Sequence, residues 1–222
     1  MGLFDFFKSG EGGAPAPRQL DHPEQLQQGD MVQFDFCQQP QLSNRSYTVT
    51  RFETLDCGGE SSKRCYLWLK DGEQSIRILA ASGDQIEVAI ELLPEDLLQL
   101  VEEQAVVELL NPDSGMLHVL EAVQPPQRLP DSLQGWGNEQ YRQEGYLKAY
   151  RYATDYRHRT MPSAQNGGEI GCDYAFLVSD DRQHRLEFLV FDGGRTEVYI
   201  ATLLPLRKFR EFWPAASSRH ST

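Results

Sequence analysis

The sequence lacks the features that place a chain in or across a membrane. No run approaches the roughly 18 consecutive apolar residues of a membrane-spanning helix. Near the start, Asp5 and Lys8 interrupt the apolar residues, so we expect no secretory signal peptide. These absences predict a cytoplasmic protein without a transmembrane segment.

Cysteine is scarce, at four residues in 222: Cys37, Cys57, Cys65 and Cys172. None forms a CxxC pair or stands at zinc-finger spacing from a histidine. The pattern predicts reduced thiols, no metal site and no cofactor, and it leaves open whether Cys57 and Cys65 pair. No nucleophile, phosphate-binding or dinucleotide motif is present either, so we expect a protein that is not an enzyme.

Positive charge is scarce in the first part of the chain. Residues 1–130 hold nine basic and 21 acidic residues, a net charge of −12, whereas residues 131–222 hold twelve of each. This balance argues against a protein that coats duplex DNA. The asymmetry is typical of two modules with different partners, but solubility explains it more simply.

Apolar and polar residues alternate in many segments of the sequence, and this alternation predicts a mainly β protein with minor α content. We expect strands at 31–36, 46–54, 65–70, 75–80, 85–91, 172–179, 185–191 and 196–202, and a long Tyr-rich segment at 145–159. The period changes at 94–103, which predicts one clear helix that begins at Pro94. Residues 105–110 and 116–123 resemble a hairpin, and 206–213 resemble a short C-terminal helix.

The two strand-rich regions match each other at an offset of 110 residues. Residues 66–90 align with 176–200 without a gap, and seven of the 25 positions are identical. We therefore predict two tandem related antiparallel β-modules packed against each other. The predicted organisation is an aromatic peptide and linker (1–27), an acidic β-module with the helix (28–124), a second β-module (125–213) and a tail (214–222).

The start MGLFDFFK, the QQGDMVQF segment and the unit SYTVTRF…CYLWLKDGE resemble an uncharacterised bacterial β-rich family. That family is associated with phage-shock-type, PspA-like membrane-stress proteins. The resemblance covers mostly 28–92 and the repeat at 145–205, and the longer loop at 160–171 departs from the first copy. It implies an accessory role in the cytoplasm, peripheral to the inner membrane, and implies no catalytic residues.

Aromatic and basic residues alternate in the segment 141–159. The candidate binding residues there are Tyr146, Lys148, Tyr150, Arg151, Tyr152, Tyr156, Arg157 and Arg159. Such a pattern can stack bases and hold phosphates in single-stranded nucleic acid. A structural strand that pairs with the acidic first module explains the pattern better, so we consider nucleic acid the less favoured partner.

A second candidate surface is the aromatic N-terminal peptide, with Phe4, Phe6 and Phe7. An exposed aromatic cluster on a tether can bind a protein groove or lie at a membrane interface. Together these features predict a non-enzymatic adaptor with a protein partner, such as a membrane-associated stress protein. The alternatives are single-stranded nucleic-acid binding through 141–159, and a ligand or enzymatic site between the two modules.

Overall fold

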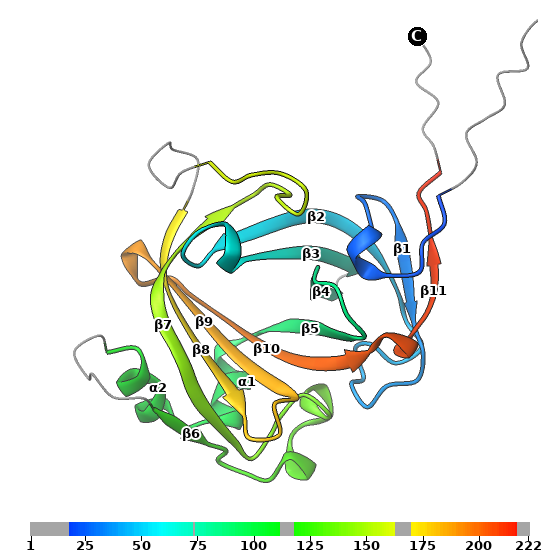
Figure 1. Ribbon diagram of the computed structural model, residues 1–222. Coiled ribbons are helices and arrows are strands. Elements are labelled where there is room, and N and C mark those ends of the chain that lie inside the picture. The colour runs from blue at the N-terminus through cyan, green and yellow to red at the C-terminus, as the bar shows by residue number, and fades with distance from the viewer. Residues whose placement is uncertain (1–17, 73, 112–117, 163–169, 217–222) are drawn as a thin grey trace, which may run out of the picture.

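The fold is a closed antiparallel β-barrel with additional strands and two short helices (Figure 1). A computed structural model describes residues 18–72, 74–111, 118–162 and 170–216. Their strands are β1 (Met31–Phe34), β2 (Ser46–Asp56), β3 (Lys63–Asp71), β4 (Gln74–Leu79), β5 (Gln85–Leu92), β6 (Val119–Glu121), β7 (Gln140–Tyr152), β8 (Ile170–Ser179), β9 (His184–Phe191), β10 (Thr196–Pro205) and β11 (Phe209–Trp213). The sequence thus predicted the mainly β class correctly.

The barrel consists of two four-stranded meanders joined along two seams. Strands β2 to β5 form one meander and β7 to β10 the other. Strand β5 pairs with β10 over eight residue pairs, with Ile90 opposite Ile200. Strand β2 closes the ring on β7 over three pairs, including Leu55 opposite Arg151. Two separate modules are therefore not seen in the described residues, since both halves build one barrel.

Alternating side chains divide the strands into an interior and an outer face. Contacts between strands that are not neighbours, such as Tyr66 of β3 with Glu187 of β9, must cross the interior of the ring. The intervening residues Leu67 and Leu69 of β3 belong to a large hydrophobic cluster on the other face. The interior holds charged side chains and a smaller hydrophobic cluster, and the outer face is apolar.

Two helices, α1 (Pro94–Leu100) and α2 (Glu103–Leu109), lie outside the ring (Figure 1). Leu97, Leu100 and Leu109 belong to the large hydrophobic cluster on the outer face. Further cover comes from β1, β11 and the segment at 126–136, whose side chains belong to the same cluster. The helices are thus held by their apolar faces, as amphipathic helices on a sheet usually are.

Two predicted elements were wrong. Residues 105–110 were expected as a strand of a hairpin, but α2 occupies Glu103–Leu109. β-branched residues such as Val106 and Val107 favour strands, yet the packing of Leu109 against the barrel selects a helix. Residues 206–213 were expected as a helix, but only a 3-10 turn forms at Leu206–Lys208. Strand β11 follows because it can pair with the edge of β1.

Local chemistry sets the turns, and contacts join the first and last described segments. Gly72, after Asp71 in the β3–β4 turn, has a φ of 59°, which glycine adopts at little cost. The backbone N–H of Ala215 donates to Asp30 at 2.7 Å, so the first and last described segments lie together, beside β1 and β11 (Figure 1).

Candidate functional site

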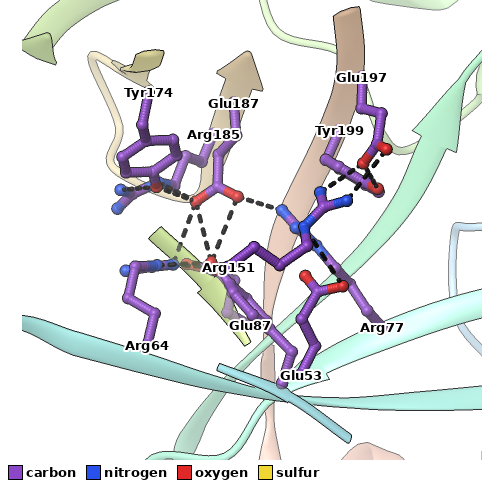
Figure 2. A network of polar contacts seen from close by, with 11 residues as sticks. Glu53, Arg64, Arg77, Glu87, Arg151, Tyr174, Arg185, Glu187, Glu197 and Tyr199 are labelled. Atoms are coloured by element: carbon purple, nitrogen blue, oxygen red, sulfur yellow. Dashed lines mark hydrogen bonds and ion pairs between the residues drawn. The ribbon is translucent and has the colours of Figure 1, made fainter. Parts of the chain in front are cut away.

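Eight charged side chains form a connected network inside the barrel (Figure 2). They are the arginines Arg64, Arg77, Arg151 and Arg185 and the glutamates Glu53, Glu87, Glu187 and Glu197. We call them the interior network. Small neighbours, among them Ala89 and Ala201, leave room for these long side chains.

Glu187 is the centre of one half of this network. Its side chain has no exposed surface and forms an ion pair with Arg77, whose side chain is also buried. Arg185 Nε lies 2.8 Å and Arg64 Nη2 3.2 Å from the same carboxylate. The Tyr174 hydroxyl donates to Glu187 Oε1 at 2.6 Å. The carboxylate therefore has partners on β3, β4, β8 and its own strand β9.

The surrounding cations keep Glu187 ionised. Burial alone would raise the pKa of a carboxyl group, because it penalises the charged form. The opposing charges of Arg77, Arg64 and Arg185 and the Tyr174 hydrogen bond outweigh burial and hold the pKa of Glu187 well below its usual range. Arg77 in turn lies over the rings of Tyr66 and Tyr199, 4.3 and 3.6 Å from their centroids.

Arg151 is the centre of the other half. Its two terminal nitrogens donate to the two oxygens of Glu197 at 3.0 and 2.5 Å, a bidentate geometry. Its Nε lies 3.6 Å from Glu53, which belongs to the acidic first part of the chain. The Tyr199 hydroxyl also donates to Glu197, at 2.8 Å. Arg151 thus connects β7 with β10 and β2 across the barrel.

The interior network balances its own charge. Four arginines face four glutamates, and the more exposed Arg51 and Arg195 also pair with Glu53 and Glu197. Glu53 Oε1, Trp68 Nε1 and Arg77 Nη1 are buried without a hydrogen-bond partner in the described part of the protein. Our hypothesis is that this network fixes how the two halves meet, a role that buried ion pairs have in some proteins.

Sequence reasoning missed the interior network, although one signal was present. Arg77 and Glu187 are 110 residues apart, which is the offset of the internal match. Each is a charged residue with an apolar residue directly before and after it in its strand. Opposite charges at equivalent strand positions indicate a buried pair across the two halves.

The predicted Tyr/Arg segment is largely internal in the structure. Arg151 belongs to the interior network and Tyr152 is buried. Tyr146, Tyr150 and Tyr156 are partly buried, and Tyr156 packs edge-on against Tyr152. The side chain of Lys148 is 75% exposed and pairs with Asp173, and Arg159 is exposed. The residues are not brought together on one accessible strip, and nucleic-acid binding stays a prediction.

Arg157, a predicted binding residue, holds the start of the described chain in place. Its side chain is 6% exposed and pairs with Asp155 at 2.8 Å. Its terminal nitrogens donate to the carbonyls of Glu24 and Leu26 at 2.7 and 2.9 Å, and its guanidinium lies over Phe52. The predicted peptide residues Phe4, Phe6 and Phe7 lie outside the described residues.

One cluster contains the residue types of a hydrolase triad but not its geometry. Ser179 Oγ donates directly to Asp181 at 2.5 Å, and His184 Nδ1 lies 3.8 Å from the same carboxylate. A catalytic serine would instead bond to the histidine. Ser179 is buried and accepts the backbone N–H of His184 at 2.9 Å. The cluster therefore caps the β8–β9 turn.

The four cysteines are free thiols, so Cys57 and Cys65 do not pair. Burial raises the pKa of Cys57 to about 12 and that of Cys172 to about 11. Both thiols are therefore protonated at neutral pH and poorly nucleophilic.

An apolar groove of about 310 Å³ lies between the two helices and the barrel. We call it the helix groove. Its apolar lining includes Leu97 and Leu98 of α1, Val106, Val107 and Leu110 of α2 and its end, and Val198 of β10. Leu98 is 45% and Val107 57% exposed. Sequence reasoning missed the groove because it assigned Val106 and Val107 to a strand.

Glu103 lines the helix groove, and the helices that border the groove carry further acidic residues and no basic ones. No lysine or arginine occurs between Arg77 and Arg128 in the sequence. The two helices and the two residues between them carry Glu95, Asp96, Glu102, Glu103 and Glu108, which we call the helix acids. Among the described residues none of these five forms an ion pair within 4.0 Å. Burial and the charge of Glu95 raise the pKa of Asp96.

Searches for other features and for relatives add little to these sites. Within the described ranges, no group of three or more His, Cys, Asp or Glu residues could hold a metal ion. No helix there is long and apolar enough to cross a membrane. Comparison with protein-family models, curated proteins and solved structures found no match.

Proposed function

We propose that this protein is a non-enzymatic interaction protein that binds a partner through the helix groove. The observation that carries the proposal is the exposure of Leu98 and Val107 on either side of one concave apolar surface. Apolar side chains gathered in a groove mark binding sites for proteins or ligands, whereas scattered ones do not.

The energetics support a peptide-sized contact. Burying the remaining surface of a Leu or Val side chain contributes on the order of 1 kcal/mol, which is about half of its full transfer free energy. Several such side chains together suit a partner that binds reversibly. We place this interaction in the cytoplasm, and the sequence resemblance makes membrane-associated stress proteins the first partners to test.

We infer further that the two halves of the barrel descend from one duplicated unit. The sequence match at an offset of 110 supports this, and so does the β5–β10 register, in which the equivalent residues Ile90 and Ile200 face each other. The pairing of Arg77 with Glu187, also equivalent positions, fits an arrangement with approximate two-fold symmetry.

A matched pair of double variants tests the binding function. Leu98→Ser with Val107→Ser removes the exposed apolar rim, and Phe36→Ser with Ile170→Ser removes two apolar residues exposed elsewhere (66% and 52%). Exposed substitutions change stability by only about 0.5 kcal/mol each, so both variants should fold. Tagged full-length chains are used to capture cellular proteins, which are quantified by mass spectrometry.

We expect at least one protein whose recovery falls about tenfold or more with the groove variant and not with the control. If the groove variant recovers the same proteins in the same amounts as the wild type, the helix groove is not the binding surface.

A further inference from the structure

The floor of the helix groove offers side chains and no free backbone. Val198 lies on β10, which pairs with β5 on one side and β9 on the other. Leu92 of β5 also lines the groove, and it pairs with Val198. A partner therefore cannot add a strand here, because strand addition requires an unpaired sheet edge.

The shape that fits such a surface is a helix. An amphipathic helix docks through apolar side chains at positions i, i+3, i+4 and i+7 and leaves its own backbone hydrogen-bonded internally. The helix groove presents apolar side chains of α1 on one side and of α2 on the other, which suits one row of such residues.

The negative charge near the groove indicates which side chains the polar face of the partner helix should carry. Glu103 lines the groove itself, and the other helix acids lie on the same two helices or, for Glu102, on the connection between them. Because none of them has a cation partner among the described residues, they repel one another and leave a negative potential over the apolar surface. Lysine or arginine residues beside a bound helix would relieve this repulsion.

We propose that the occupant of the helix groove is a cationic amphipathic helix of a partner protein, with its apolar side chains in the groove and its lysines or arginines beside the helix acids. This inference rests on the proposed function and names the chemistry of its ligand. Electrostatic attraction would chiefly raise the association rate and select the partner, and apolar burial would supply most of the affinity.

The test uses three synthetic helical peptides with the same apolar face of leucines. Their opposite face carries lysine in the first peptide, glutamine in the second and glutamate in the third. Each is titrated into the full-length chain and followed by fluorescence anisotropy at low and high salt, because exposed charge interactions weaken as salt screens them.

Four forms of the protein are compared. The groove variant is Leu98→Ser with Val107→Ser. The acid variant is Glu102→Gln with Glu103→Gln. A charge-matched control, Asp21→Asn with Glu211→Gln, removes two exposed carboxylates that form no ion pair with any described residue. Asp21 precedes β1 in the chain, and Glu211 lies on β11, which is away from the helices (Figure 1). The fourth form is the wild type.

We expect the lysine peptide to bind at least about tenfold more tightly than the glutamate peptide. Its affinity should fall in both the groove variant and the acid variant, and fall with salt, while the control matches the wild type. If all three peptides bind equally and only the groove variant weakens them, the groove binds apolar helices regardless of charge. The cationic inference is then wrong, although the proposed function stands.

If the lysine peptide binds the groove variant as tightly as the wild type, or the control loses as much affinity as the acid variant, attraction to the overall negative charge explains the binding. The cationic helix is then rejected as the occupant. The capture experiment with the same groove variant decides separately whether any protein uses the groove.

Discussion

At the scale of single residues, Glu187 is a fully buried carboxylate held by three arginines and one tyrosine hydroxyl. A carboxylate buried alone would take up a proton, because desolvation of a charge costs far more than desolvation of an acid. Three arginines and one tyrosine hydroxyl around Glu187 prevent this. Removal of the one negative charge would leave Arg77 buried without its main partner.

We therefore predict that Glu187→Gln lowers the free energy of unfolding by about 3–5 kcal/mol at neutral pH, the range found when one partner of a buried ion pair is removed. Urea denaturation measures the change. Glu211→Gln, at an exposed position on β11, is the control and should change stability by no more than about 0.5 kcal/mol.

The pH dependence of the free energy of unfolding tests the same prediction in a second way. Because folding lowers the pKa of Glu187, its stabilising contribution is complete above the unfolded pKa of about 4.3 and is lost as the pH falls through the lower folded value. The stability gap between wild type and Glu187→Gln should narrow below about pH 4. A constant gap from neutral to acid pH would show that the charge of Glu187 does not stabilise the fold.

Residue types alone did not reveal these roles. Arg151 and Arg157 look like surface cations in the sequence. In the structure, the strands that pair with β7 bury Arg151 in the barrel, and contacts of the loop after β7 bury Arg157. A strand's alternation says which residues share a face, but it does not say which face is covered. That depends on the closure of β2 on β7, a contact that joins residues about a hundred positions apart.

At the scale of elements, Arg157 links the segment before β1 to the loop after β7. Of its two backbone acceptors, the carbonyl of Glu24 lies within the 3-10 turn at Pro23–Gln25 and that of Leu26 directly follows the turn. Backbone hydrogen bonds of Gly29 and Asp30 with Val49 also attach this segment, and Arg157 adds two bonds from a buried guanidinium.

We predict that Arg157→Ala loosens this segment and leaves the barrel intact. The amide hydrogens of Leu26 and Asp30 should exchange about tenfold faster or more, because local opening no longer breaks two charge-assisted hydrogen bonds. Hydrogen exchange followed by NMR measures the effect, with the exposed Arg159→Ala as control. Equal acceleration in both variants would mean that Arg157 does not hold the segment.

Elements with a strong local signal were predicted well. Turn residues and two-residue alternation located β2 to β5 and β8 to β10 to within a few residues. Pro94, followed by Glu95 and Asp96, marked the start of α1. The failures, at α2 and β11, are places where a tertiary partner decides between helix and strand. The helix groove depended on one of these failures, so the sequence could not predict it.

At the scale of the whole molecule, four strand pairings join the two halves in the described residues: β1–β11, β2–β7, β5–β10 and β6–β7. The interior network also spans both halves. Neither half encloses a core by itself, since each supplies four of the eight strands of the ring.

We predict that fragments 1–123 and 124–222, cut at the proline-rich segment, do not fold separately but form a 1:1 complex when mixed. Each lone fragment should bind a hydrophobic dye and unfold without a cooperative transition, whereas the mixture should unfold cooperatively. Circular dichroism and size-exclusion chromatography follow both. Cooperative unfolding of either fragment as a monomer would show that the halves are independent modules after all.

The strand order also has a consequence for how the chain is made. Strand β5 can pair with β10 only after more than a hundred further residues have been synthesised. Strand β1 can pair with β11 only after residues 209–213 have been added. At about 5–20 residues per second, the first meander emerges from the ribosome roughly ten seconds before its edges can be covered. During synthesis it carries unpaired strand edges and an open apolar surface, so the nascent chain is a predicted client of ribosome-associated chaperones.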